Sequence, residues 1–309
     1  AGNISGGVLG LETLIGNPFI NIGSIKLNLL SVCIGMVAFI ILFIGNYKTL
    51  EKILVSLVII MSLAFLITAI ITKPDMSLII QSDFILKLPQ DSLLMVIAPI
   101  GTTVVLYNIF LLASLAKAKW QDKNGLKFAR KDTFIAVLLG GVVSMCIIIS
   151  AASIQSNSIA NAVDLAKGLE PLFGSFAKYF LAVGLFAAGI TSAITAPLAA
   201  AYVASGCLGW KTNMRSKKFR SIWMFILFLG VLFSSLDIKP IDIIKFAQIA
   251  NGVLLPIIAG FLIWIMNQKA ILGDYKNSIK QNIFGFIILG ISILLSLATL
   301  NKVFNLNIF

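Results

Sequence analysis

The sequence predicts an all-α protein that crosses a membrane several times, and three observations lead to this fold class. First, 59% of the 309 residues are hydrophobic, only 12% are charged, and the mean hydropathy is +1.02, whereas about 25% of the residues of a soluble domain are charged. Second, the apolar residues fall in runs of roughly 17 to 25, which is the length of a membrane-spanning helix and not of a barrel strand. Third, the cationic residues gather in short segments between these runs, as they do in membrane proteins.

Nine apolar runs are expected to span the membrane. The first is short, and the last follows the others after a polar connection. The expected spans cover residues 4–20, 28–45, 52–72, 92–116, 134–153, 175–208, 221–236, 243–266 and 283–300.

The cationic residues predict how these spans are oriented. Alternate connections place 16 of the 24 Lys and Arg residues on one side of the membrane and 8 on the other. Since the richer side faces the cytoplasm, we expect a cytoplasmic (inner) membrane protein whose N-terminal end lies inside and whose C-terminus lies outside. The net charge of +12 is then explained by cations that set the orientation in the membrane. The expected partner is the lipid bilayer, and no nucleic acid is expected. Because the chain starts at Ala1 and is apolar from Ile4, we also expect that it lacks an N-terminal part.

The fourth span contains an unusual segment, "APIGTTVVLYN", from Ala98 to Asn108. Pro99 removes a backbone hydrogen bond, Gly101 lowers helix stability, and the run at 102–105 is β-branched. We therefore predict a helix break close to Gly101. In transporters such breaks mark substrate and ion sites near the membrane midplane, and the alternative is a kink filled by a neighbouring helix. The polar groups that this segment offers are Thr102, Thr103 and Asn108.

Three other spans contain polar residues in apolar surroundings. The eighth span places Gln248 and Asn251 on one helix face, before Pro256, so their amides either form a second wall of a polar site or bond across helices. Glu12 is the one acidic residue expected at membrane depth, where an ionisable group is a functional candidate, unless the short first span places it near an interface. The sixth span is rich in Gly, Ala, Ser and Thr, which predicts close helix packing.

Catalytic chemistry is not expected. Histidine is absent, and no nucleophile–base pair or pair of carboxylates is expected at membrane depth. The three cysteines lie in apolar runs without metal-ligand spacing. We therefore expect neither an enzyme nor a bound cofactor.

Several of these segments together resemble the natural resistance-associated macrophage protein (NRAMP) family of divalent-metal transporters. The segment "GTTVVLYNIFLLAS", from Gly101, aligns without a gap with the family pattern G-A-T-V-M-P-H-N-L-Y-L-H-S of its broken sixth helix. The segment "GGVLGLETLIGNPF", from Gly6, is similar to the family's third helix. The segment "LFAAGITSAITAPLAA", from Leu185, is similar to its eighth helix, and "QIANGVLLP", from Gln248, is similar to its tenth. The resemblance covers nearly the whole chain.

The resemblance implies a leucine-transporter-like fold in one transmembrane domain over residues 1–309. Residues 1–72 would be a partial first repeat, 92–266 the second, inverted repeat, and 283–300 an additional helix. The metal ion, as substrate, would bind between the family's broken first and sixth helices, and the first is not in this chain. Where the family has methionine, proline and histidine, this chain has Val105, Leu106 and Tyr107, and Asn108 matches the family's asparagine. Loss of the thioether favours harder ions.

We therefore expect a secondary transporter that moves divalent cations of the manganese, iron or magnesium class by alternating access, with proton coupling left open. The alternative is an amino-acid or other small-solute symporter of the same fold, and a non-transporting membrane subunit fits the sequence less well. A monomer is one assembly that the sequence allows. The expected binding residues are Thr102, Val105, Asn108, Gln248 and Asn251, of which Thr102, Asn108 and Gln248 would contact the metal. Glu12, Thr103 and Tyr107 are candidates for a proton or ion path, and Pro99 and Gly101 for the helix break.

Overall fold

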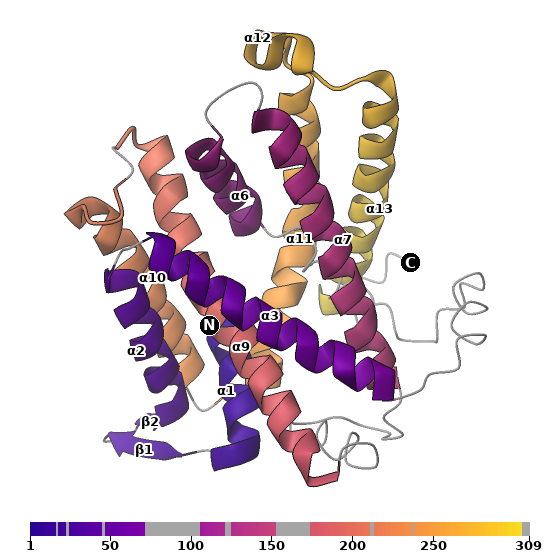
Figure 1. Ribbon diagram of the computed structural model, residues 1–309. Coiled ribbons are helices and arrows are strands. Elements are labelled where there is room, and N and C mark those ends of the chain that lie inside the picture. Colours follow the sequence, from indigo (N-terminus) through magenta and orange to yellow (C-terminus); the bar gives the residue numbers. More distant parts are fainter. Residues whose placement is uncertain are drawn as a thin grey trace. The chain divides into compact units, whose positions relative to one another are not determined.

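The structure is a computed structural model, and it describes residues 1–16, 18–22, 25–44, 47–71, 106–120, 125–152, 174–210, 213–236 and 238–304. Helices dominate these residues (Figure 1). The elements are α1 (Gly2–Ile15), β1 (Phe19–Ile22), β2 (Ile25–Asn28), α2 (Leu29–Ile44), α3 (Tyr47–Ile71), α6 (Leu106–Lys119), α7 (Gly125–Ala152), η1 (Gly174–Phe176), α9 (Ala177–Cys207), α10 (Lys217–Ser235), α11 (Pro240–Met266), α12 (Lys269–Leu272), η2 (Gly273–Tyr275) and α13 (Ile279–Phe304).

Five of the described helical segments are long and apolar enough to cross a membrane, which confirms an all-α membrane protein in its general class. The predicted number of nine helices and the leucine-transporter-like fold stay predictions. The five segments are Gly125–Ile149, Gly174–Cys207, Lys217–Ser235, Pro240–Met266 and Ile279–Ala298.

The predicted first span is wrong at its C-terminal end. It was expected to reach residue 20, but α1 ends at Ile15 because Gly16 takes a φ of 78°, a backbone conformation that L side chains rarely adopt. Pro18 follows closely, and β1 and β2 pair antiparallel, with Phe19 opposite Asn28 and Ile22 opposite Ile25. The strands in the part of the chain that the structure describes are these two.

Helix α7 begins at Gly125, earlier than the predicted span at residue 134. Its first turns include Lys127, Arg130 and Lys131, which were expected in the preceding connection. Its large apolar side chains, such as Val137 at 70% and Phe134 at 69%, are exposed in the structure. Exposed apolar side chains on a helix of this length suit the hydrocarbon core of a membrane.

The chain divides into two compact units, described separately. Unit 1 comprises Ala1–Ile85 and Phe110–Ile244, and unit 2 comprises Leu86–Ile109 and Lys245–Phe309. This division does not follow the predicted repeats, and the repeat assignment stays a prediction.

The core of unit 1 is a group of four helices, α1, α2, α9 and α10, each of which packs on the other three. Buried apolar side chains recur every fourth residue on α2 and α10, which gives each helix a continuous stripe facing its neighbours. On α10 this stripe consists of Phe219, Trp223 and Leu227. Helix α3 lies against α9 and also contacts α7.

Glycines allow the closest of these contacts. A Cβ atom on Gly189 of α9 would collide with the backbone of Gly7 on α1 and lie 2.9 Å from the Asn3 carbonyl oxygen. A Cβ atom on Gly10 would lie 2.8 Å from the Ala182 carbonyl oxygen. The predicted close packing of the small-residue span is confirmed, and α1 is its partner.

Candidate functional site

The predicted helix break falls in a part of the chain that the structure does not describe. Pro99, Gly101, Thr102, Thr103 and Val105 lie outside the described residues. The predictions for these five residues therefore stay predictions.

Helix α6 starts at Leu106, so the backbone of Tyr107 and Asn108 lies in its first turn. About one turn later Leu111 is buried, which shows that the described part of α6 packs against other residues. At the C-terminal end Lys117 and Lys119 occupy the last turn, where cations interact favourably with the helix dipole.

Gln248 and Asn251 lie in α11, which continues through Pro256 without interruption. The spacing of three residues puts them on the same face of this helix, and the Asn251 side chain is half-buried. Unit 2 contains both residues, and it also contains the chain up to Ile109, including Asn108. The two segments expected to form walls of one site thus belong to the same compact unit.

Glu12 lies in the last turn of α1 and is half-buried. The Oε1 atom of Glu12 is buried and has no hydrogen-bond partner among the described residues. This oxygen therefore has an unused capacity to accept a proton or contact a cation.

A buried serine cluster links three helices of unit 1, and sequence reasoning missed it. Ser31 Oγ donates to the Ser234 carbonyl oxygen at 2.9 Å, and Ser234 Oγ lies 3.0 Å from both Ser31 Oγ and Ser5 Oγ. All three side chains are at most 5% exposed. These hydroxyls join α1, α2 and α10. The three serines lie in three different apolar runs, so the sequence contains no signal that would bring them together.

The threonine hydroxyls of α9 form hydrogen bonds within their own helix. Thr191 Oγ1 donates to the Ala187 carbonyl oxygen at 2.6 Å, and Thr195 Oγ1 to that of Ser192 at 3.3 Å, both within α9. The interhelical bond comes from Asn3 on α1, whose Nδ2 donates to the Ser192 carbonyl oxygen at 3.2 Å. The Ser192 carbonyl can accept more than one donor because its oxygen carries two lone pairs.

Arg220 in the first turn of α10 interacts with the C-terminal end of α2. Its Nη2 donates to the Phe43 carbonyl oxygen at 2.9 Å, and its guanidinium lies 4.4 Å from the centre of the Phe43 ring. The carbonyl is one of the last four of α2, which have no partner inside the helix. Arg220 therefore caps α2.

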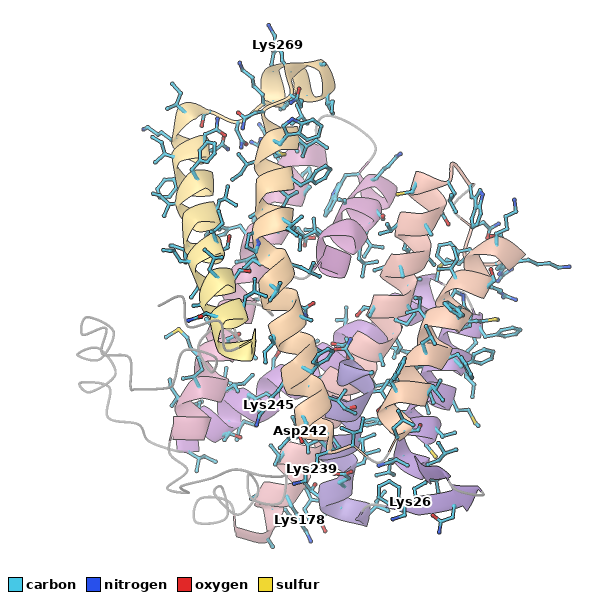
Figure 2. All side chains as sticks on the ribbon, turned by 180° about the vertical axis from the view of Figure 1, so that it is seen from behind. Lys26, Lys178, Lys239, Asp242, Lys245 and Lys269 are labelled. Carbon is cyan, nitrogen blue, oxygen red and sulfur yellow. The ribbon has the colours of Figure 1, made fainter. Side chains whose placement is uncertain are left out.

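Charged groups mark one end of unit 1. Figure 2 shows Lys26, Lys178, Lys239 and Asp242 at the same end. The three lysines come from connections expected on the side of the membrane with fewer cations, and the orientation itself stays a prediction. Within the described residues, no three His, Cys, Asp or Glu side chains lie close enough together to hold a metal ion.

The five long apolar helices and the exposed apolar side chains of α7 are those of a multi-pass integral membrane protein. Residues 1–302 match the family described as natural resistance-associated macrophage protein-like (Nramp). The chain belongs to this family, which confirms the resemblance found in the sequence.

Individual relatives are distant in sequence. The divalent metal cation transporter MntH of Caldanaerobacter subterraneus subsp. tengcongensis is 24% identical over 266 residues, which are 82% of this chain and 62% of that protein. MntH of Levilactobacillus brevis is 22% identical, covering 95% of this chain and 68% of its own length. The natural resistance-associated macrophage protein 2 homolog of Dictyostelium discoideum is 25% identical, and the match covers 98% of this chain and 49% of that protein. The chain thus spans about half to two thirds of the length of these relatives.

Proposed function

We propose that this chain belongs to a secondary transporter that moves divalent metal cations across the cytoplasmic membrane by alternating access. The observation that carries the proposal is the family match over residues 1–302. It is supported by relatives that carry the name divalent metal cation transporter. The metal ion is the substrate, and the proposal includes no enzymatic step and no cofactor.

The binding residues in this proposal come from the two segments expected to face each other. Asn108 and Gln248 supply amide oxygens. Thr102 and Val105 supply backbone carbonyls or line the site. Asn251 lies on the same helix face as Gln248. Oxygen ligands suit hard ions such as magnesium, and also manganese. The position of Asn108 and Gln248 in one compact unit supports this assignment.

Glu12 is the proposed proton or ion relay, together with Thr103 and Tyr107. Its support is the buried Oε1 atom without a partner among the described residues. Burying a carboxylate in a membrane helix is costly, so a carboxylate found there is a candidate for a functional role. Proton coupling is part of this proposal.

Alternating access needs a part of the protein that keeps its packing while another part moves. The four helices α1, α2, α9 and α10 suit the first role, since the contact of Gly189 with Gly7 and the serine cluster hold them closely together. The end of unit 1 that carries Lys26, Lys178 and Lys239 is proposed to face outside, with the N-terminal end of the chain inside and the C-terminus outside.

Uptake into liposomes tests the function. The reconstituted protein is offered manganese, iron, magnesium and calcium ions, and in parallel a panel of amino acids. Uptake of at least one divalent cation, saturable and above that of protein-free liposomes, is expected. Uptake of an amino acid without any divalent cation would refute the proposal and favour a symporter of organic solutes.

A further inference from the structure

In unit 2, hydrogen bonds between asparagines join α11 to α13 at the end where α11 stops and α13 starts. Asn267 Nδ2 donates to Asn282 Oδ1 at 2.8 Å, and Asn282 Nδ2 donates back to Asn267 Oδ1 at 2.6 Å. Asn277, in the connection between the helices, donates from its Nδ2 to Asn282 Oδ1 at 3.1 Å. All three side chains are half-buried. We call these three residues the asparagine clasp.

The clasp also holds the last turn of α11. Asn267 Nδ2 donates to the Ile263 carbonyl oxygen at 2.8 Å, and the backbone nitrogen of Asn277 donates to the Met266 carbonyl oxygen at 2.9 Å. A polar pair between two otherwise apolar helices fixes their register, because sliding one helix along the other would leave the amides unpaired. The clasp is therefore expected to set the register of α13 on α11.

The apolar contacts further along the two helices follow this register. A Cβ atom on Gly285 would lie 3.2 Å from Ile263 Cγ1, and a Cβ atom on Gly260 would lie 3.9 Å from Leu289 Cδ1. Each glycine thus faces a large side chain of the other helix. Counted from the clasp, the first pair lies four residues back on α11 and three residues on along α13, and the second pair lies seven residues away on both. Steps of three and four residues are those of a coiled coil.

The far end of this seam lies beside the predicted binding residues. Ser296 Oγ on α13 donates to the Val253 carbonyl oxygen on α11 at 3.4 Å, and Ser296 is 7% exposed. Val253 follows Asn251 by two residues and precedes Pro256, which lacks a backbone N–H and so weakens the hydrogen bonding of α11 at this point. The Ser296 hydroxyl supports α11 where the proline weakens it.

The seam and the predicted binding residues occupy different faces of α11. At about 100° per residue, the position midway between Gln248 and Asn251 lies about 135° around the helix from the middle of the seam. Figure 1 and Figure 2 both show α13 running alongside α11. Helix α13 therefore supports α11 from behind and leaves the face of the two amides uncovered.

We propose that Asn267, Asn282 and Ser296 are positioning residues for α11. They fix its register on α13, so the two helices take part in transport as one body and Gln248 and Asn251 keep a constant position on it. This inference rests on the proposed transport of divalent metal. The three positioning residues do not contact the ion, and they act through the helix that carries its ligands.

The double substitution Asn267→Leu with Asn282→Leu tests the register. Leucine keeps an apolar contact but removes the amides, so the helices stay packed while their register is no longer fixed. In liposomes the KM for manganese is expected to rise about fivefold, the equivalent of one hydrogen bond, whereas the midpoint of thermal unfolding does not fall. A merely structural role would lower the midpoint and leave KM unchanged. The matched control is Gln281→Ala, which loses bonds to Ser278 N and Oγ at 2.8 and 3.0 Å beside the clasp and keeps KM within about twofold.

A reversible cross-link tests whether the two helices act as one body. Asn267→Cys and Asn282→Cys are combined in a protein whose native Cys33, Cys146 and Cys207 are replaced by alanine. A bifunctional methanethiosulfonate reagent bridges the two thiols, and a reductant removes the bridge. The bridged protein is expected to regain the KM of the unmodified protein, and the reduced protein to show the raised KM. The single variant Asn282→Cys, treated in the same way, cannot be bridged and shows the raised KM throughout.

Loss of uptake on bridging, restored by reductant, would overturn the proposal, because it would show that α11 shifts along α13 during transport. Unchanged KM in the leucine variant would also overturn it. If the unmodified protein takes up no divalent metal, the proposed function fails by itself, and the bridging yield still tests the register. A cysteine at position 267 is expected to bridge to one at 282 and not to one replacing Ile287, which is 51% exposed on the outer side of α13. Equal yields for the two pairs would contradict the register.

Discussion

The substitution Gly189→Ala tests the contact between α1 and α9. The new methyl group would collide with the Gly7 nitrogen and Cα and lie 2.9 Å from the Asn3 carbonyl oxygen, whereas ordinary contact starts at 3.4 Å. The Asn3 oxygen would therefore have to recede by about 0.5 Å, and Gly7 by more, to reach ordinary van der Waals contact. All three atoms are backbone, so no flexible side chain can move aside.

The expected cost follows from two opposing effects. Overpacking a close contact costs about 1–3 kcal/mol, and the absence of a side chain that can yield places this site near the upper value. Replacing glycine by alanine inside a helix contributes about 1 kcal/mol in the opposite direction. The net loss in free energy of unfolding is about 2 kcal/mol.

The matched control is Gly141→Ala in α7, where a Cβ atom meets nothing within 4 Å. This variant keeps only the favourable helix effect and is expected to gain about 1 kcal/mol. The midpoints of thermal unfolding in detergent are compared, and Gly189→Ala is expected to unfold several degrees below the unmodified protein and further below Gly141→Ala. Equal midpoints for the two variants would refute the close contact of α1 with α9.

Two further substitutions test the polar contacts of unit 1. Ser234→Ala removes the hydroxyl that contacts Ser5 and Ser31. We expect the free energy of unfolding to fall by about 1–3 kcal/mol, because the remaining buried hydroxyls are less well satisfied. Thermal unfolding measures this loss, and an unchanged midpoint would contradict the cluster. Arg220→Lys removes the planar group that bonds to the Phe43 carbonyl and stacks on its ring. We expect the protein to lose about 1 kcal/mol of stability and to be cleaved faster by protease near the end of α2. Unchanged resistance to protease would argue against the cap.

The sequence predicted the helices well because a membrane-spanning helix needs a long apolar run, and such a run is visible without any knowledge of packing. The expected spans 28–45 and 175–208 differ by only one to two residues from α2 and α9. The hairpin at 19–28 was missed because its strands are only four residues long and apolar. They continue the hydropathy of α1, and only Gly16 and Pro18 signal the change.

The site was predictable to a smaller extent. Glu12 was identified because a carboxylate in an apolar run is unusual, and Gln248 with Asn251 because of their spacing. The capping of α2 by Asn28 was not, since asparagine beside a strand is an ordinary turn residue until the donors of Leu30 and Ser31 are seen around it. Contacts between distant segments, such as Ser5 with Ser234, depend on tertiary packing, which no local pattern encodes.

Metal uptake by variants of the predicted ligands tests the proposed function most directly. Manganese uptake into liposomes is compared for the unmodified protein, the double variant Asn108→Ala with Gln248→Ala, and the control Gln268→Ala, which lies in the connection before α12. We predict that the unmodified protein and the control take up the ion at the same rate and that the double variant loses most of this uptake. Unchanged uptake by the double variant, or no uptake of any divalent cation by the unmodified protein, would contradict the proposal.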